Sequence, residues 1–273
     1  MNIHECKLIV SDLDGTLIKY GSEIVSNVTK TVIKKLIDNG YYFTLATGRS
    51  WKQTREIARK LNVTLPVILQ AGAIVLNPVT EKPLRIQPLR LEIETELRQI
   101  LNSPHVDQFC LNESGMYFAT QVNTRGGNWM VASGEECRLC QAGLPDNPII
   151  KHLFIGSEVE LKALIDKIET TINPKPNWIL WPPDLMTEDW FLEVFDPLAS
   201  KGQALAWLAG QLKVKAEETV AFGDGYNDLD MIRWAGLGVV IDTAPEELKE
   251  VASKIIPGPE KDGVTEFMSC FLG

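Results

Sequence analysis

The sequence predicts an α/β protein whose core is a doubly wound parallel sheet, interrupted by an inserted α/β cap domain. At both ends of the chain, short apolar strands alternate with helical patterns, which is typical of a parallel sheet with helices on both faces. Between about residues 84 and 190, polar loops, prolines and alternating segments replace this pattern. We therefore expect a discontinuous, Rossmann-like core of residues 1–83 and 191–273 and a cap of residues 84–190.

The N-terminal part supplies the first elements of this core. The apolar run Leu8–Val10 predicts a buried strand. In the helix expected over Ser26–Asn39, apolar residues recur at helical spacing, and Gly40 follows as a stop signal. The elements expected next are a strand over Tyr42–Ala46, a helix over Trp51–Leu61 and a strand over Val67–Leu69.

The inserted segment carries two helical patterns and several strand patterns. The helices are expected over Leu91–Leu101 and Glu158–Ile172. The strands are expected over Gln108–Leu111, Met116–Ala119, Lys151–Ile155 and Trp178–Leu180. We interpret this segment as a separate domain built on an antiparallel sheet.

After Phe195 the strand–helix alternation resumes. The expected elements are a helix over Lys201–Leu212, a strand over Thr219–Phe222, a helix over Asp228–Ala235, a strand over Leu237–Ile241 and a helix over Pro245–Ala252. Both parts of the chain then contribute to one sheet.

Composition narrows the class of protein. The formal net charge of −9 argues against a general binder of nucleic acid or of anionic membranes, because both need a basic surface. No apolar run approaches the roughly 20 residues of a membrane span, and no secretory signal pattern precedes the first strand. Five scattered cysteines fit reduced thiols better than a disulfide framework. We expect a cytoplasmic protein that binds neither nucleic acid nor membrane.

Two carboxylates stand at the end of the first predicted strand, in Asp12-Leu13-Asp14-Gly15-Thr16. Residues two apart in an extended chain point to the same side, so Asp12 and Asp14 lie together where open α/β sheets place their sites. Like charges this close favour a shared cation or proton. A nucleophilic carboxylate, an acid/base carboxylate and a metal suit phosphoryl transfer, although turn or cap carboxylates are common at strand ends.

A second acidic cluster follows the strand Thr219–Phe222, in Gly223-Asp224-Gly225-Tyr226-Asn227-Asp228. If the two strands are neighbours, the two loops together form a group of hard oxygen ligands. Such ligands suit Mg²⁺.

These residues carry a resemblance. The chain resembles the haloacid dehalogenase superfamily, in its Cof-type or sugar-phosphatase-like branch, through four motifs in the family's order. The motifs are Asp12-Leu13-Asp14-Gly15-Thr16, Ala46-Thr47-Gly48-Arg49, Lys201 in Ser200-Lys201-Gly202, and Gly223-Asp224-Gly225-Tyr226-Asn227-Asp228. The late Asp262-Gly263-Val264 also resembles a family signature. The resemblance implies an α/β cap inserted between the second and third motifs.

The resemblance implies a phosphatase that hydrolyses a small phosphorylated metabolite, such as a sugar or sugar-acid phosphate. Asp12 would attack phosphorus and form an aspartyl phosphate, with Asp14 as the general acid and base. Lys201 would neutralise Asp12 and the phosphate. Thr47, with Gly48 and nearby amides, would hold phosphate oxygens, or Thr47 could simply cap a helix.

The implied cofactor is Mg²⁺. Its expected ligands are Asp12, Asp14, Asp224, Asn227 and Asp228, the last two by holding a metal water or Lys201. For Arg49, contact with the substrate and a plain surface position are equally open.

Several alternatives stay open. A phosphomutase of the same fold would return the phosphoryl group to the sugar, and a catalytically silent binding or regulatory protein is a further possibility.

Cys137 and Cys140 have zinc-like spacing without a second pair, so an ordinary role is favoured. Ala71 stands where this branch usually has Asn. The tryptophans Trp129, Trp178, Trp181 and Trp190 could stack on a sugar or belong to the core. The oligomeric state is not predicted.

Overall fold

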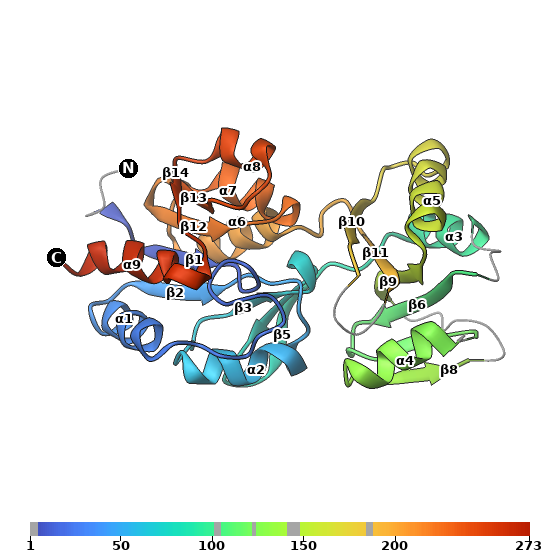
Figure 1. Cartoon of the computed structure of the whole chain (residues 1–273), viewed down its shortest axis with the longest axis horizontal. Coiled ribbons are helices and arrows are strands. Elements are labelled where there is room, and N and C mark those ends of the chain that lie inside the picture. The colour runs from blue at the N-terminus through green and yellow to red at the C-terminus, as the bar shows by residue number, and fades with distance from the viewer. Residues whose placement is uncertain (1–4, 101–104, 122–123, 141–147, 184–187) are drawn as a thin grey trace. The chain divides into compact units, whose positions relative to one another are not determined.

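The computed structural model describes residues 5–100, 105–121, 124–140, 148–183 and 188–273. The chain divides into two compact units, one reaching up to Arg85 and resuming at Ser200, the other formed by Ile86–Ala199. The first unit therefore joins the blue N-terminal and the red C-terminal elements of Figure 1. The predicted α/β fold class with a parallel core sheet is confirmed.

The first unit is built on a five-stranded parallel sheet in the order β14-β13-β12-β1-β2. Its strands are β1 (Leu8–Ser11), β2 (Tyr42–Leu45), β12 (Thr219–Gly223), β13 (Leu237–Ile241) and β14 (Lys254–Ile256). Its helices are α1 (Asn27–Asp38), α2 (Trp51–Lys60), α6 (Lys201–Leu212), α7 (Leu229–Trp234), α8 (Glu246–Val251) and α9 (Gly263–Ser269). Because β1 lies between β2 and β12, the loops that follow these three strands meet at one edge of the sheet.

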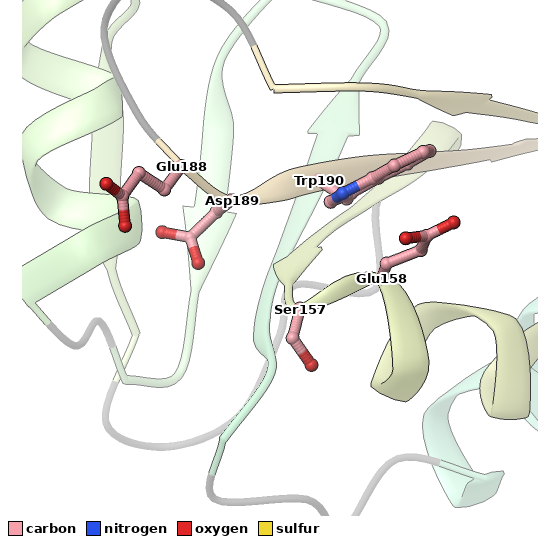
Figure 2. Close-up of a pocket in the computed structure, with 5 residues that line it drawn as sticks. All are labelled: Ser157, Glu158, Glu188, Asp189 and Trp190. Atoms are coloured by element: carbon pink, nitrogen blue, oxygen red, sulfur yellow. The ribbon is translucent and has the colours of Figure 1, made fainter.

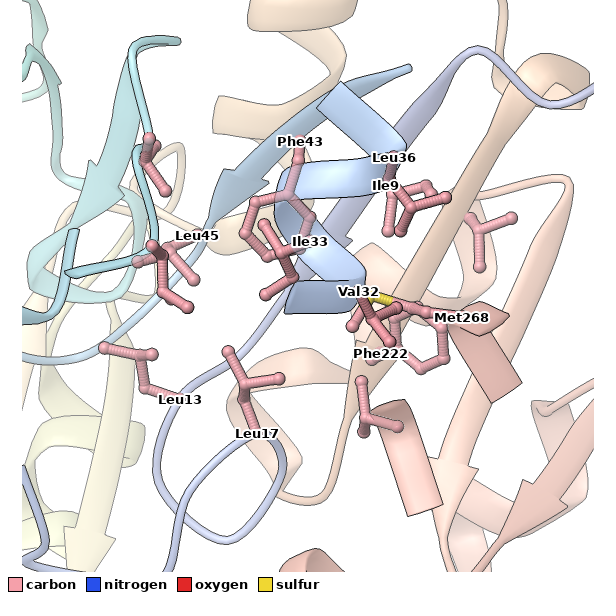
Figure 3. Packing of buried hydrophobic residues seen from close by; sticks show 14 of the residues in the cluster. Ile9, Leu13, Leu17, Val32, Ile33, Leu36, Phe43, Leu45, Phe222 and Met268 are labelled. Atoms are coloured by element: carbon pink, nitrogen blue, oxygen red, sulfur yellow. The ribbon is translucent and has the colours of Figure 1, made fainter. Parts of the chain in front are cut away.

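Residues on β1 alternate between two hydrophobic layers. Ile9 belongs to the layer that contains Ile33 of α1 and Met268 of α9, and Figure 3 shows these side chains packed together with Phe43. Leu8 and its neighbours pack on the opposite face with the apolar residues of α6, α7 and α8. Successive side chains of a strand point to opposite faces, so a fully apolar strand such as β1 predicts helices on both sides of the sheet.

The strand over Val67–Leu69 is confirmed, but it does not extend the parallel sheet. β3 (Val67–Leu69) forms a separate three-stranded sheet with β4 (Ile74–Asn77) and β5 (Lys82–Ile86). It pairs antiparallel with β4 and touches the core sheet through a single parallel bridge from Ala46 to Ile68. The short helix η2 (Gln70–Gly72) turns the chain between β3 and β4. The other short helices are η3 (Ala216–Glu218), η4 (Tyr226–Asp228), η5 (Pro259–Lys261) and η6 (Cys270–Leu272).

The second unit contains a six-stranded sheet in the order β10-β11-β9-β6-β7-β8, which is antiparallel except for the pair β7–β8. Its strands are β6 (Asp107–Asn112), β7 (Tyr117–Ala119), β8 (Cys137–Leu139), β9 (Ile149–Gly156), β10 (Asn177–Trp181) and β11 (Trp190–Phe195). Its helices are α3 (Leu91–Ile100), α4 (Thr124–Ala132) and α5 (Glu158–Thr171). One face of the sheet packs against α3 and α5, and the other carries a second cluster that includes Met130 of α4.

The boundaries of the second unit differ from the sequence prediction at its C-terminal side. The predicted break between residues 190 and 191 falls inside β11, which pairs with β9 and β10. Residues 191–199 therefore lie with the second unit, because cutting β11 out would leave β10 unpaired and β9 with β6 alone. The expected helix end at Leu101 lies outside the described residues. Within the described residues, no helix is long and apolar enough to cross a membrane.

A buried histidine on β9 makes the second unit sensitive to acid. His152 has no exposed surface, and its Nδ1 lies 2.8 Å from the Gln108 Nε2. Burial, with Arg98 nearby, lowers the pKa of His152 to about 3. The unfolded chain then binds more protons than the folded one between about pH 6.5 and 3, so stability falls as the pH falls through this range.

We expect the His152→Gln variant to lose this component of the pH dependence. As the pH is lowered from about 6.5 to 3, the free energy of unfolding should decrease more steeply for the wild type than for the variant. The difference between the two slopes should reach about 1.4 kcal/mol per pH unit. Urea unfolding at several pH values measures both slopes, and the exposed His105→Gln variant is the matched control. Equal slopes for the wild type and His152→Gln would contradict the argument.

Candidate active site

The loops after β1, β2 and β12 and the first residue of α6 bring the predicted motifs together in the first unit. Asp12 follows β1, and its amide donates to the Phe222 carbonyl of β12 at 3.0 Å. On the other side, the Ala46 amide donates to the Ser11 carbonyl at 2.9 Å. These backbone contacts fix the three strand ends side by side. The strands β1 and β12 are therefore neighbours, as the predicted magnesium site requires.

Lys201 lies at the centre of this arrangement. Its Nζ donates to Asp12 Oδ1 and to Asp228 Oδ1, each at 2.6 Å, and the lysine has no exposed surface. Lys201 is the first residue of α6, after Ser200, whose hydroxyl accepts from the Gln203 amide at 3.2 Å as the helix cap. The helix therefore starts where the lysine can reach both carboxylates.

Close packing against η2 also holds the start of α6. Gly72 has a φ of +99°, and a Cβ placed on it would lie 2.1 Å from the Ser200 carbonyl oxygen. Only glycine fits this contact without displacing the backbone next to Lys201. Gln70 and Ala71 also have positive φ values, so the chain is strained just where it turns beside α6.

The loop after β12 is organised by Asp228. Its Oδ2 accepts from the amides of Asp224 and Gly225, both at 3.0 Å, while Oδ1 accepts from Lys201. Both oxygens of Asp228 are thus engaged in shaping the loop and holding the lysine. Asn227 is half-buried in η4, and its Oδ1 lies beside Gly225.

Asp224 is held by two hydroxyl donors that the sequence analysis did not assign. Thr16 Oγ1 donates to Asp224 Oδ1 at 2.9 Å, and the Tyr20 hydroxyl donates to Asp224 Oδ2 at 2.7 Å. Thr16 belongs to the first motif, and this is the one signal in the sequence for its place at the site. Nothing in the sequence pattern points to Tyr20, because its contact crosses 204 positions of the chain.

The electrostatics of the site follow from three carboxylates around one buried cation. Burial raises the pKa of Asp12 well above its ordinary value, and Asp228 and Asp224 add to the rise while Lys201 opposes it. Burial and Asp228 likewise raise the pKa of Asp224. For Lys201, burial alone would lower the pKa, but the two aspartates raise it above its usual value. Lys201 therefore stays charged, and the carboxylates favour additional positive charge.

This donor set fits a divalent cation. Asp12, Asp224 and Asp228 each offer a carboxylate oxygen, and these oxygens lie within 4.8 Å of one another. Three acidic groups and one lysine leave a negative excess that a hard cation such as Mg²⁺ would relieve. Asp228 accepts three hydrogen bonds, two of them on Oδ2, whereas each oxygen of Asp224 accepts one, so Asp12 and Asp224 are better placed as direct ligands.

The structure does not bring the Asp14 side chain into this group of carboxylates. Arg49 donates from Nε to Asp14 Oδ2 at 2.7 Å and from Nη2 to Asp14 Oδ1 at 2.5 Å. Both side chains are largely buried, at 14% and 23% exposed. Arg49 is therefore neither a plain surface residue nor free for a ligand in this state, since it forms a two-pronged ion pair with the expected acid/base residue.

Thr47 is fully buried at the end of β2, and its hydroxyl accepts from the Arg49 amide at 3.1 Å. The alternative that Thr47 caps α2 is wrong, because Ser50 takes that role and accepts from the Gln53 amide at 3.4 Å. Gly48 lies half-buried in the turn between them. Thr47 and Gly48 are thus placed in the loop beside Asp12 and not in the helix.

The second unit contains a pocket with a volume of about 430 Å³. Its lining residues are Ser157, Glu158, Glu188, Asp189 and Trp190 (Figure 2). The lining is acidic, so it does not suit a phosphorylated ligand.

The other residues noted in the insertion show ordinary surroundings. Trp129 stacks at a tilt on Phe191, with ring centroids 5.3 Å apart, and Trp181 Nε1 donates to Glu193 at 3.1 Å. Trp178 is 38% exposed and donates from Nε1 to Glu169 at 2.7 Å. Cys137 and Cys140 are partly exposed free thiols, and within the described residues they join no group of metal ligands.

Comparison with known proteins identifies the family. The sequence matches the haloacid dehalogenase-like hydrolases over residues 9–268, so the chain belongs to this family of hydrolases. It is 26% identical to the 5-amino-6-(5-phospho-D-ribitylamino)uracil phosphatase of Bacillus subtilis, over 96% of this chain and 96% of that protein. A segment of 80 residues is 41% identical to the phosphoglycolate phosphatase of Archaeoglobus fulgidus, covering 29% of this chain and 35% of that protein.

Solved structures agree on the fold. A haloacid dehalogenase-like hydrolase from Bacteroides thetaiotaomicron superposes with a TM-score of 0.80 and 24% identity, over 97% of this chain and 99% of that one. The family resemblance that the four motifs indicate is therefore confirmed.

The buried ion pairs of Lys201 predict a large stability effect. Lys201→Met keeps the aliphatic stem but leaves Asp12 and Asp228 without their shared cation. Because uncompensated buried charge is costly, we expect a loss of about 3–5 kcal/mol in the free energy of unfolding at neutral pH. Urea unfolding measures this loss.

The matched control is Lys34→Met, which breaks an exposed ion pair to Asp38 of the same 2.6 Å length. An exposed pair contributes at most about 1 kcal/mol, so this variant should unfold nearly as the wild type does. Equal stabilities of the two variants would show that Lys201 does not neutralise the aspartates.

Proposed function

We propose that this protein is a Mg²⁺-dependent phosphatase that hydrolyses a small phosphomonoester through an aspartyl-phosphate intermediate. The observation that carries the proposal is the buried Lys201, which donates to both Asp12 and Asp228. Asp224 lies beside them, and the chain belongs to the haloacid dehalogenase-like hydrolases. The two phosphatases named above act on small phosphorylated metabolites, which supports a sugar or sugar-acid phosphate as substrate.

In the first step, an Asp12 oxygen attacks phosphorus, an acyl phosphate bond forms and the bond to the leaving oxygen breaks. Lys201 favours the ionised form of Asp12 and offsets the charge that builds on the phosphoryl oxygens. Thr47 and the amides of its loop, including Gly48, contribute hydrogen bonds to those oxygens. A Mg²⁺ ion held by Asp12 and Asp224 would supply further neutralisation of the phosphate.

Asp14 transfers protons in both steps. It gives a proton to the leaving alkoxide, then takes one from the water that attacks the aspartyl phosphate, which releases inorganic phosphate and restores Asp12. In the structure Asp14 forms a two-pronged ion pair with Arg49. A phosphate dianion is an alternative partner for the same guanidinium, so substrate binding would loosen the pair and free Asp14 for proton transfer.

We also propose that the second unit acts as a cap that selects the leaving group, within a cytoplasmic enzyme. Its folded sheet and its own hydrophobic clusters support an independent domain, since it needs no core residue to complete them.

Release of inorganic phosphate tests the proposal. Wild type with Mg²⁺ and a panel of metabolite phosphates should release phosphate, lose this activity in EDTA and regain it when Mg²⁺ is restored. Asp12→Asn should lose essentially all turnover, because an amide cannot attack phosphorus, and a cooperative melting curve verifies that the variant is folded. Isomer interconversion without phosphate release would identify a phosphomutase instead, and no turnover of any substrate would support a silent binding protein.

The acid/base role of Asp14 predicts a dependence on the leaving group. Asp14→Asn should lose more activity on an alkyl phosphate than on an aryl phosphate, because an aryl oxide leaves without a proton. Initial rates on both substrates measure the ratio. Equal losses on the two substrates would contradict the assignment.

A further inference from the structure

We propose that Tyr20 is a positioning residue of the metal site, which holds Asp224 in the orientation that binds a divalent cation. The proposal rests on the metal dependence proposed above and adds a residue that none of the four motifs contains. Its starting observation is the hydrogen bond from the Tyr20 hydroxyl to Asp224 Oδ2, at 2.7 Å.

Two hydroxyl donors fix the orientation of the Asp224 carboxylate, one on each of its oxygens. Thr16 Oγ1 donates to Oδ1 at 2.9 Å and Tyr20 donates to Oδ2. A carboxylate rotates easily about its terminal bond, and one donor on each oxygen sets that rotation. Each oxygen accepts at two positions, so a cation can bind Asp224 while both hydroxyls stay in place.

Core packing does not explain the position of Tyr20. The residue is 66% exposed, so its ring has little to gain from burial. It lies instead against Gly15, where an added Cβ would stand 2.5 Å from Tyr20 Cε2 and 2.2 Å from Asp224 Oδ2. The bare backbone of Gly15, with a φ of +79°, lets the tyrosine and the aspartate meet.

The loop that carries Tyr20 is held on its far side by the Asp14–Arg49 pair. Arg49 Nη2 donates to the Ser22 carbonyl at 2.9 Å, and the Gly21 amide donates to Asp14 Oδ1 at 3.3 Å. Tyr20 therefore sits on a loop anchored at the acid/base residue and reaches across to the metal ligand. Partners that orient a metal ligand typically change metal affinity about 10- to 100-fold when removed.

The test compares metal binding by the wild type, Tyr20→Phe and Tyr41→Phe. Tyr41 is the matched control because its hydroxyl donates to the Phe271 carbonyl at 3.1 Å and because it precedes β2, at the edge of the sheet opposite the carboxylate group. Titration calorimetry with Mg²⁺, and the electron paramagnetic resonance spectrum of bound Mn²⁺, report on the site without substrate. Melting curves in EDTA verify that the variants are folded.

We expect Tyr20→Phe to bind Mg²⁺ about 10-fold more weakly and to broaden the Mn²⁺ spectrum, while Tyr41→Phe matches the wild type. Turnover of Tyr20→Phe should recover when Mg²⁺ is raised to saturation. Unchanged or tighter binding by Tyr20→Phe, with normal binding by the wild type, would overturn the role of Tyr20 alone. Absence of cation binding by the wild type would overturn the metal site, and the role of Tyr20 with it.

Discussion

The rest of the core depends on the buried contact of Lys201 with Asp12 and Asp228. Asp12 lies in the loop after β1, Lys201 at the start of α6 and Asp228 in the loop after β12. A lysine without exposed surface is stable only if its charge is met, and two aspartates that close are tolerable only around a cation. The arrangement therefore exists only when the sheet is assembled from both ends of the chain. Folding and the catalytic chemistry that we propose depend on the same contact.

The parallel order of the core sheet explains why this contact can form at all. β1 lies between β2 and β12, so the residues that follow each strand reach the same edge. Asp12 has the Thr47 loop on one side and the Asp224 loop on the other. Ligands of open α/β sheets bind where the chain turns away in opposite directions from neighbouring strands, and β1 is that point here. The topology thus supplies the location, and the loops supply the chemistry.

The site is also held by residues outside the four motifs. Gly72 allows η2 to approach the backbone at Ser200, and Tyr20 closes over Gly15 onto Asp224. Arg49 links the loop of Tyr20 to Asp14. Such contacts keep acidic groups at fixed separations despite their mutual repulsion. Under the proposed function, the group of charges around Lys201 is preorganised for a phosphate, and only the Asp14–Arg49 pair opens when the substrate binds. Such preorganisation is a main requirement for electrostatic catalysis.

Local patterns in the sequence were enough to predict the long elements of the core. α6 begins at Lys201 and ends at Leu212, as its helical pattern predicts, and β13 matches Leu237–Ile241. Apolar periodicity and caps are local properties, so they can be read without the fold. The same holds for the motif carboxylates, since their spacing along a strand sets their side. Weakly patterned elements such as β11 and β14 escaped, because their pairing partners decide that they are strands.

The sequence by itself determined the α/β class, the family and the residues that carry charge at the candidate site. Only the tertiary structure decided how those charges are paired. It set Arg49 on Asp14, Lys201 between Asp12 and Asp228, and Tyr20 on Asp224. It also placed residues 191–199 with the second unit. The physical reason is that side-chain pairing depends on distances between segments far apart in the chain, and a single sequence contains no record of those distances.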